Sequence, residues 1–245
     1  MPINQSLRRA RIVTRRVTTG LIKHAAPAAD TLDAELTAEG EEPMNQREQM
    51  MKLAALTQKR FDAYNEEQSN LDKDEQETTT ARGGRDDTAT LLKKTLSQTS
   101  AAIRATYGAR AVKDAKLSGT VPVVPETLLS FAQGFLDATG DDFTLPEPTN
   151  PFATVDLPAA RARIDGLRGA LSDALDTVTS ELRDDQKVRN HRNDRYNTWE
   201  REVRFARDQA RAILVRAGQK ELADRLLPTD NQILGFDEIE DDDGP

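Results

Sequence analysis

The sequence contains no cysteine among its 245 residues. This absence excludes a disulfide scaffold, a thiolate metal site and a cysteine nucleophile. Lack of disulfides is compatible with a reducing compartment, and we expect a cytoplasmic protein. No stretch approaches eighteen consecutive apolar residues, which argues against a membrane-spanning helix.

Histidine is almost as scarce, with His24 and His191 the only two in the chain. A Ser-His-Asp relay needs a histidine held beside a nucleophile. His24 follows a basic segment and His191 is flanked by strongly polar residues, so we expect both to be exposed. No glutamate has a histidine three residues later, which argues against a di-iron carboxylate site.

The sequence motifs that resemble calcium-binding and phosphate-binding loops are incomplete. Asp72, Asp74 and Gln76 imitate the start of a calcium-binding EF-hand loop, but Glu77 stands where that loop requires glycine. Gly83-Gly84 is not followed by the Gly-Lys-Ser/Thr of a phosphate-binding loop. We therefore predict no catalytic residue, no metal site and no cofactor, and we expect that the protein is not an enzyme.

The composition favours helices over strands. Aromatic residues make up only 4% and charged residues 31%, and the Val-Ile-Thr alternation typical of strands is almost absent. Its nearest approach, residues 119–124, is interrupted by Pro122. We predict an all-α fold, an elongated bundle of four to five helices with a basic N-terminal helix and an acidic C-terminal tail.

Hydrophobic spacing predicts the individual helices. Apolar residues recur at steps of three and four, and Gly and Pro separate the resulting segments. The expected helices cover residues 1–24, about 45–80, about 87–117, about 126–139, the range 157–217 and a short segment ending at 226. Residues 81–87 are expected to turn. The range 157–217 is either one helix or two with a break within 183–194, and the length of that polar run favours two.

These segments suggest three parts of the chain. Residues 1–43 are read as a basic amphipathic arm followed by an acidic linker over 25–43. Residues 44–228 form the helical bundle domain, and residues 229–245 an acidic tail. We find no internal repeat at the periods of solenoid proteins.

The N-terminal arm concentrates positive charge before the first acidic residue, Asp30. Its apolar residues share one helical face. Its arginines are Arg8, Arg9, Arg11, Arg15 and Arg16. Three interpretations stay open: a terminal helix docked on its own bundle, a targeting segment like a mitochondrial presequence, or an arm that binds an acidic partner or anionic lipid.

A second basic segment runs from Arg183 to Arg216 and contains Tyr196 and Trp199. Acidic residues are interleaved with its arginines, and Glu200 and Arg204 have the spacing of a helix-stabilising ion pair. A phosphate-binding stripe has fewer acids. We therefore predict that Trp199 and Tyr196 pack in the core.

The acidic tail also carries apolar residues, which are Ile233, Leu234, Phe236 and Ile239. They suit a docking peptide, while the alternative is an unstructured tail that aids solubility. The sequence thus favours a structural or adaptor subunit of a larger assembly, whose partner is a protein, either itself or another subunit. The alternative is a binder of nucleic acid or anionic membrane through the basic arm. No small-molecule substrate is evident.

Overall fold

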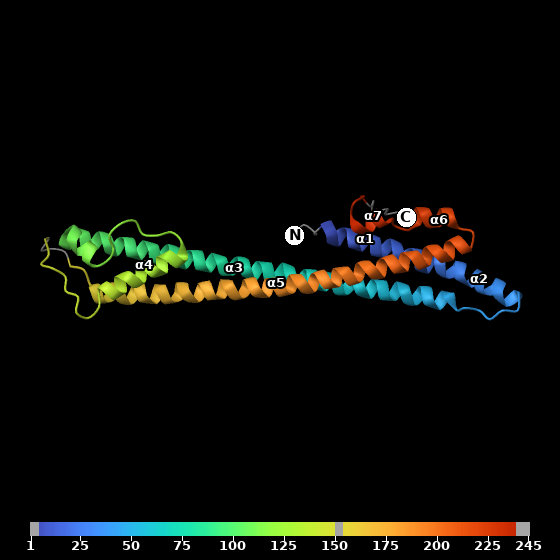
Figure 1. The fold of residues 1–245 in the computed structure, drawn as a ribbon, viewed down its shortest axis with the longest axis horizontal. Helices are drawn as coiled ribbons and strands as arrows, with labels where there is room; N and C mark the ends of the chain where they lie inside the picture. The colour runs from blue at the N-terminus through green and yellow to red at the C-terminus, as the bar shows by residue number, and fades with distance from the viewer. Residues whose placement is uncertain (1–4, 150–153, 239–245) are drawn as a thin grey trace. The chain divides into compact units, whose positions relative to one another are not determined.

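A computed structural model describes residues 5–149 and 154–238 of the chain. Within these residues every regular element is a helix, which confirms the predicted all-α bundle (Figure 1). Two compact units divide the chain. Unit 1 contains the residues up to Lys73 and those from Lys187 onward, and unit 2 contains Asp74–Gln186. Two long helices, α3 (Gln46–Asp114) and α5 (Leu157–Arg216), contribute to both.

The remaining elements of unit 1 lie near the two chain ends. They are α1 (Gln5–Thr19), the π-helical turn η1 (Gly20–Ala25), α2 (Ala26–Ala38), α6 (Lys220–Leu226) and α7 (Asp230–Leu234). Figure 1 shows α6 and α7 folded back over α1 and the end of α5.

The core of unit 1 receives the apolar face of α1. Ala10, Val13 and Val17 are fully buried and cluster with residues of α3 and α5. Trp199 and Tyr64 are the largest fully buried side chains here, and their ring centroids lie 6.1 Å apart. The structure therefore matches the interpretation of a terminal helix docked on its own bundle, and Trp199 packs in the core as predicted.

The linker expected over 25–43 is wrong for residues 26–38, which form α2. Pro27 falls in the first turn of this helix, where a proline is tolerated. Asp33 then fixes the following loop, because its carboxylate accepts hydrogen bonds from the backbone N–H groups of Met44 (3.0 Å) and Gln46 (3.1 Å). The Ala-rich composition of this segment and the hydrogen bonds that Asp33 accepts from the following loop outweigh the helix-breaking tendency of the proline and glycine residues within 25–43.

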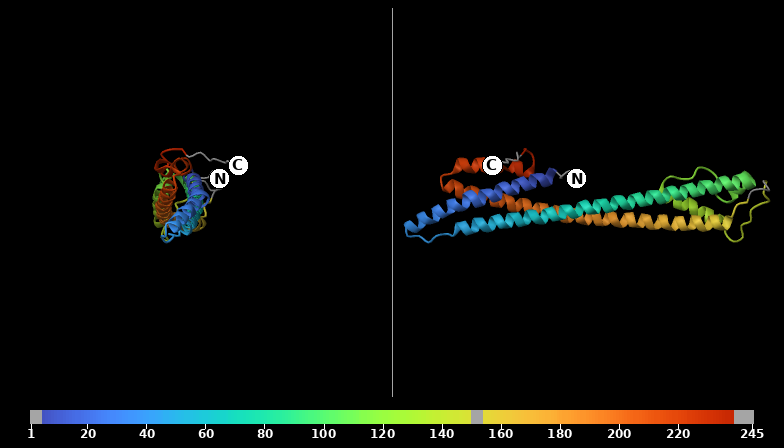
Figure 2. Two further views of the ribbon diagram at one scale, coloured as in Figure 1. Left: turned by 90° about the vertical axis from the view of Figure 1, so that its right-hand side faces the viewer. Right: turned by 180° about the vertical axis from the view of Figure 1, so that it is seen from behind.

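Unit 2 is built from the rest of α3, the first half of α5 and α4 (Pro125–Ala138), close to the helix predicted over 126–139. Figure 2 shows α4 packed beside α3 and α5. Leu92, Leu96 and Ile103 of α3 are fully buried with Leu128 of α4 and Leu171 of α5.

The turn predicted over 81–87 is wrong: α3 continues as a helix through Gly83 and Gly84. Each glycine costs a helix about 1 kcal/mol relative to alanine, which packing of the flanking turns can override. The irregularity lies instead at Gly108, whose φ of 86° and ψ of 178° are not helical.

The predicted break within 183–194 is also wrong, since α5 is a single 60-residue helix. No Gly or Pro lies between Gly169 and Gly218 to end it. Polar residues are compatible with a helix that is exposed on most sides, so the polarity of this run indicated solvent contact rather than a turn.

Candidate interaction surface

The C-terminal segment, defined here as residues 219–238, lies along α1 in unit 1. Near one end of α1, Gly20 lacks a side chain where a Cβ would come within 2.7 Å of Cδ2 of Leu227. Towards the other end, a Cβ on Gly235 would collide with the guanidinium of Arg9. Two glycines thus allow the close approach, and the segment runs antiparallel to α1.

Local chemistry defines α7. Thr229 forms a capping box with Gln232: its hydroxyl accepts from the Gln232 backbone N–H, and the Gln232 side chain accepts from the Thr229 N–H. Gly235 ends the helix at φ 84°. A helix of five residues has no stability of its own, so the burial of Ile233, which is 0% exposed, is what holds it in place.

A buried arginine joins α5 to α7. Arg207 is only 8% exposed and donates hydrogen bonds to Asp230 (2.8 Å) and Asp208 (2.7 Å). Burial by itself lowers the pKa of Arg207, but the bonds to the two carboxylates outweigh it and the pKa is raised. The guanidinium therefore stays charged, and its pairing with Asp230 orients the start of α7.

The predicted partner-binding arginines divide between two environments. Arg8, Arg11 and Arg15 are exposed at steps of three and four, and so form a stripe along α1. Arg9 and Arg16 are half-buried, and Arg9 donates a hydrogen bond to the hydroxyl of Tyr196 (3.1 Å). The structure thus uses Arg9 within the unit and presents Arg8, Arg11 and Arg15 outward.

The predicted apolar residues of the tail also divide. Ile233 is buried within this chain, Leu234 is half-buried, and Ile239 lies outside the described residues. Phe236 is 77% exposed, the most exposed of the large apolar side chains that the structure describes. Its backbone is nevertheless fixed, because its N–H donates to the carbonyl of Asn231 (2.8 Å).

Sequence reasoning missed Arg207, Leu227 and Gly20 as parts of this surface. Arg207 occurs in a row of similar arginines, and nothing local distinguishes the one that meets Asp230 twenty-three residues later. The role of Gly235 could have been predicted from the sequence, since glycine is the usual residue at the C-terminal cap of a helix.

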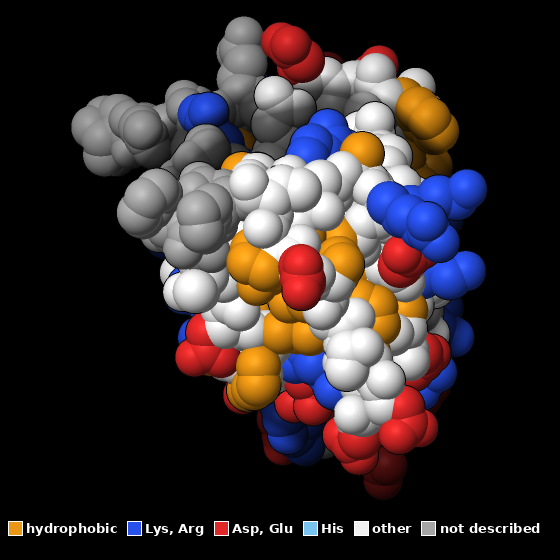
Figure 3. Space-filling model, turned by 90° about the vertical axis from the view of Figure 1, so that its left-hand side faces the viewer, with side chains coloured by type: hydrophobic (Ala, Val, Ile, Leu, Met, Phe, Trp, Pro, Cys, Tyr) orange, Lys and Arg blue, Asp and Glu red, His pale blue; other side chains and the backbone are white. Residues whose placement is uncertain are grey.

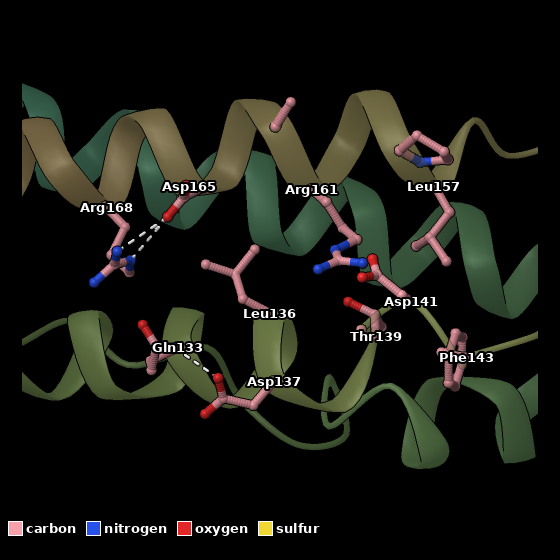
Figure 4. Close-up of a pocket in the computed structure, with 13 residues that line it drawn as sticks. Gln133, Leu136, Asp137, Thr139, Asp141, Phe143, Leu157, Arg161, Asp165 and Arg168 are labelled. Carbon is pink, nitrogen blue, oxygen red and sulfur yellow. Dashed lines mark hydrogen bonds and ion pairs between the residues drawn. The ribbon is translucent and has the colours of Figure 1, made fainter.

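A second candidate site is a polar cavity of about 700 Å³ in unit 2 (Figure 4). It lies between the end of α4 and the first turns of α5. Its polar groups largely engage one another: Arg168 pairs with Asp165 (3.0 Å), Gln133 donates to Asp137 (2.6 Å), and the hydroxyl of Thr139 donates to the carbonyl of Phe135 (2.7 Å). Arg161 and Asp141 point toward one another across the cavity (Figure 4). These contacts do not pair a nucleophile with a base.

The adjoining face of unit 2 mixes side chains of all kinds. In Figure 3 acidic and basic side chains surround a group of hydrophobic ones, with no large area of a single charge. Over residues 5–149 and 154–238, no three His, Asp or Glu side chains are grouped so that they could hold a metal ion. Among the described helices, none has the length and apolar character needed to cross a membrane.

Comparison with known proteins gives no relative. No protein-family model matches the chain, and no match to it was found among the curated proteins or the solved structures. The geometry of the chain itself is therefore the basis for the functional proposal below.

Proposed function

We propose that this protein is a non-enzymatic structural or adaptor subunit of a larger assembly, acting through helix faces and terminal peptides. One observation carries the proposal: Phe236 is held on an ordered backbone next to α7 while 77% of its surface is exposed. An exposed aromatic side chain on a fixed backbone has no backbone entropy left to lose on binding, and it removes much apolar area from water. Aromatic residues of this kind are typical anchors of protein interfaces.

The surroundings of Phe236 support the same role. Asp237 and Glu238 are exposed and follow it directly, so a partner would meet an apolar anchor with an acidic rim. Among helix faces, α5 presents Phe205, which is 53% exposed, in unit 1. The partner is a protein, either a second copy or another subunit, and the absence of cysteine favours a cytoplasmic setting.

The test compares the wild type with Phe236→Asp, with Val123→Asp as control because Val123 is 71% exposed in unit 2. Molar mass is measured by light scattering during size-exclusion chromatography, and a photo-crosslinking amino acid at position 236 reports contacts in the producing cell. We expect a wild-type mass above the 27.2 kDa of one chain that Phe236→Asp alone reduces to that of one chain, or a discrete protein crosslinked from position 236 and not from position 123. A single-chain mass at every concentration together with no crosslink at position 236 would falsify the proposal.

The alternative, binding of nucleic acid or anionic membrane through the basic arm, has one observation in its favour. The stripe formed by Arg8, Arg11 and Arg15 is exposed and one-sided. The apolar face of α1 is buried in the core, however, and is not available to insert into a lipid surface while unit 1 is folded. Strong, salt-sensitive binding of RNA or phosphatidylserine vesicles that is lost with Arg8→Glu/Arg11→Glu supports this alternative instead.

A further inference from the structure

A single tight reversal connects α5 to the C-terminal segment. At the end of α5 the N–H of Gly218 donates to the carbonyl of Val215 (3.0 Å), and the N–H of Gln219 donates to the carbonyl of Leu214 (2.8 Å). This pair of bonds is a Schellman cap, and it requires a left-handed residue, which Gly218 supplies at φ 73°. The direction of residues 219–238 thus depends on one glycine.

The C-terminal segment, which follows that reversal, packs back against elements that precede it. Ala223, Leu227 and Ile233 are buried in the core of unit 1. The segment is also tied to α5 by two ion pairs, Arg211 with Asp224 and Arg207 with Asp230. Each of these contacts could equally form between the C-terminal segment of one copy and the core of a second copy.

The sequence across the reversal is also compatible with an uninterrupted helix. Residues 213–222 read Ile-Leu-Val-Arg-Ala-Gly-Gln-Lys-Glu-Leu, and apart from Gly218 and the β-branched Ile213 and Val215 they are good helix formers. If the cap opens, α5 can continue as a straight helix into α6. The C-terminal segment is then carried away from its own core and needs an equivalent core in which to bury Ile233.

We infer that the C-terminal segment, residues 219–238, exchanges between two copies of this chain, with Gly218 as the hinge. The acceptor surface is the one described above, formed by Arg9 on α1, Gly20 at the start of η1 and Arg207 on α5. Each copy places its Ile233 and Asp230 in the other, so that all contacts of the closed chain are kept and only the hinge differs. This inference rests on the proposed function, because it names a second copy as the partner.

The decisive variant is Gly218→Ala. A Cβ at position 218 would meet no atom within 4 Å, so the substitution adds backbone strain and no steric clash. The left-handed conformation disfavours an alanine by roughly 5- to 30-fold. A swapped dimer relieves this strain at two hinges, so we expect its dissociation constant to fall by roughly 25-fold or more. The control is Gly166→Ala, because Gly166 lies within α5 without a left-handed φ and also has open space around it.

The dimer must also be shown to be swapped. Arg211 and Asp224 lie in contact on either side of the hinge, and the side chain of each is about half exposed. In the double variant Arg211→Cys/Asp224→Cys these are the only two thiols of the full-length chain, so a short bis-maleimide reacts at this pair alone. The closed chain gives an intrachain bridge that runs as a monomer on a denaturing gel. A swapped pair gives a covalent dimer.

Wild-type and Gly218→Ala backgrounds are each refolded at high concentration, separated by size and then crosslinked. We expect the dimer fraction to yield covalent dimers, the monomer fraction to yield intrachain bridges, and Gly218→Ala to enrich the dimer. A dimer whose bridges are all intrachain overturns the exchange but leaves the proposed function standing. Absence of any dimer in both backgrounds also overturns the exchange, while photo-crosslinking from position 236 still reports on the proposed function separately.

Discussion

The indole N–H of Trp199 donates a hydrogen bond to the hydroxyl of Thr14 at 2.9 Å, although the two residues are 185 positions apart. Trp199 is 0% exposed and Thr14 is 1% exposed, so water does not compete for the bond. This contact fixes α1 against α5 and satisfies the single polar group of the largest side chain in the core. The position of α1 in turn determines where the C-terminal segment lies.

Replacing Thr14 by valine keeps the shape of the side chain and removes the acceptor. The buried indole N–H is then left without a partner, and we expect a loss of about 1–3 kcal/mol in the free energy of unfolding. Urea denaturation followed by tryptophan fluorescence measures it directly, since Trp199 is the only tryptophan. Thr177→Val is the matched control, because Thr177 is exposed and bonds only to the Asp173 carbonyl of its own helix. Equal stability of the two variants would show that the bond to Thr14 contributes nothing.

Glycine-to-alanine substitutions distinguish the two kinds of glycine in α3. Gly83 is helical with open space around it, so Gly83→Ala is expected to raise the free energy of unfolding by about 0.5–1 kcal/mol. Gly108 lies in a region of φ and ψ that only glycine adopts readily, and Gly108→Ala is expected to lower it by about 1–3 kcal/mol. Thermal and urea unfolding measure both. If Gly83→Ala destabilises instead, residues 81–87 form a turn after all.

The environment of Asp74 predicts that the free energy of unfolding depends on pH. Burial raises the pKa of Asp74, and the nearby carboxylates of Asp185, Glu77 and Asp184 raise it further. The folded protein therefore holds this proton more tightly than the unfolded chain does, so ionisation of Asp74 costs stability. The cost is absent at low pH and appears as the pH rises through the ordinary range of an aspartate and past the raised pKa.

Asp74→Asn removes this cost. We expect the variant to be more stable than the wild type near about pH 7 and to differ little from it near about pH 3, where the carboxyl is neutral in both states. Urea unfolding at the two pH values gives the difference, and Asp176→Asn, an exposed carboxylate of α5, is the control. A stabilisation that is the same at both pH values would mean that the charge of Asp74 is not its cause.

Several helix ends follow from local sequence. Gly218 ends α5 and Pro228 follows α6, both as the sequence predicts, because a cap or a ring constraint acts within one or two residues. The apolar face of α1 was equally readable, since burial follows helical period. The candidate site was predicted only in part: Ile233 and Phe236 were recognised as apolar, but their opposite exposure was not.

Local sequence is enough to predict that the chain is helical, which helix faces are apolar, and that the two chain ends differ in charge, because these properties depend on residues a turn or two apart. The remaining features depend on tertiary packing. It carried α3 through Gly83 and α5 through a polar run, since packing of the neighbouring turns outweighs an unfavourable local preference of about 1 kcal/mol. In the folded chain Arg207, and none of the neighbouring arginines that the structure describes, pairs with Asp230. Ile233 is buried and Phe236 is exposed to solvent. Those pairings join residues far apart in the chain, and only the folded backbone brings them within reach of one another.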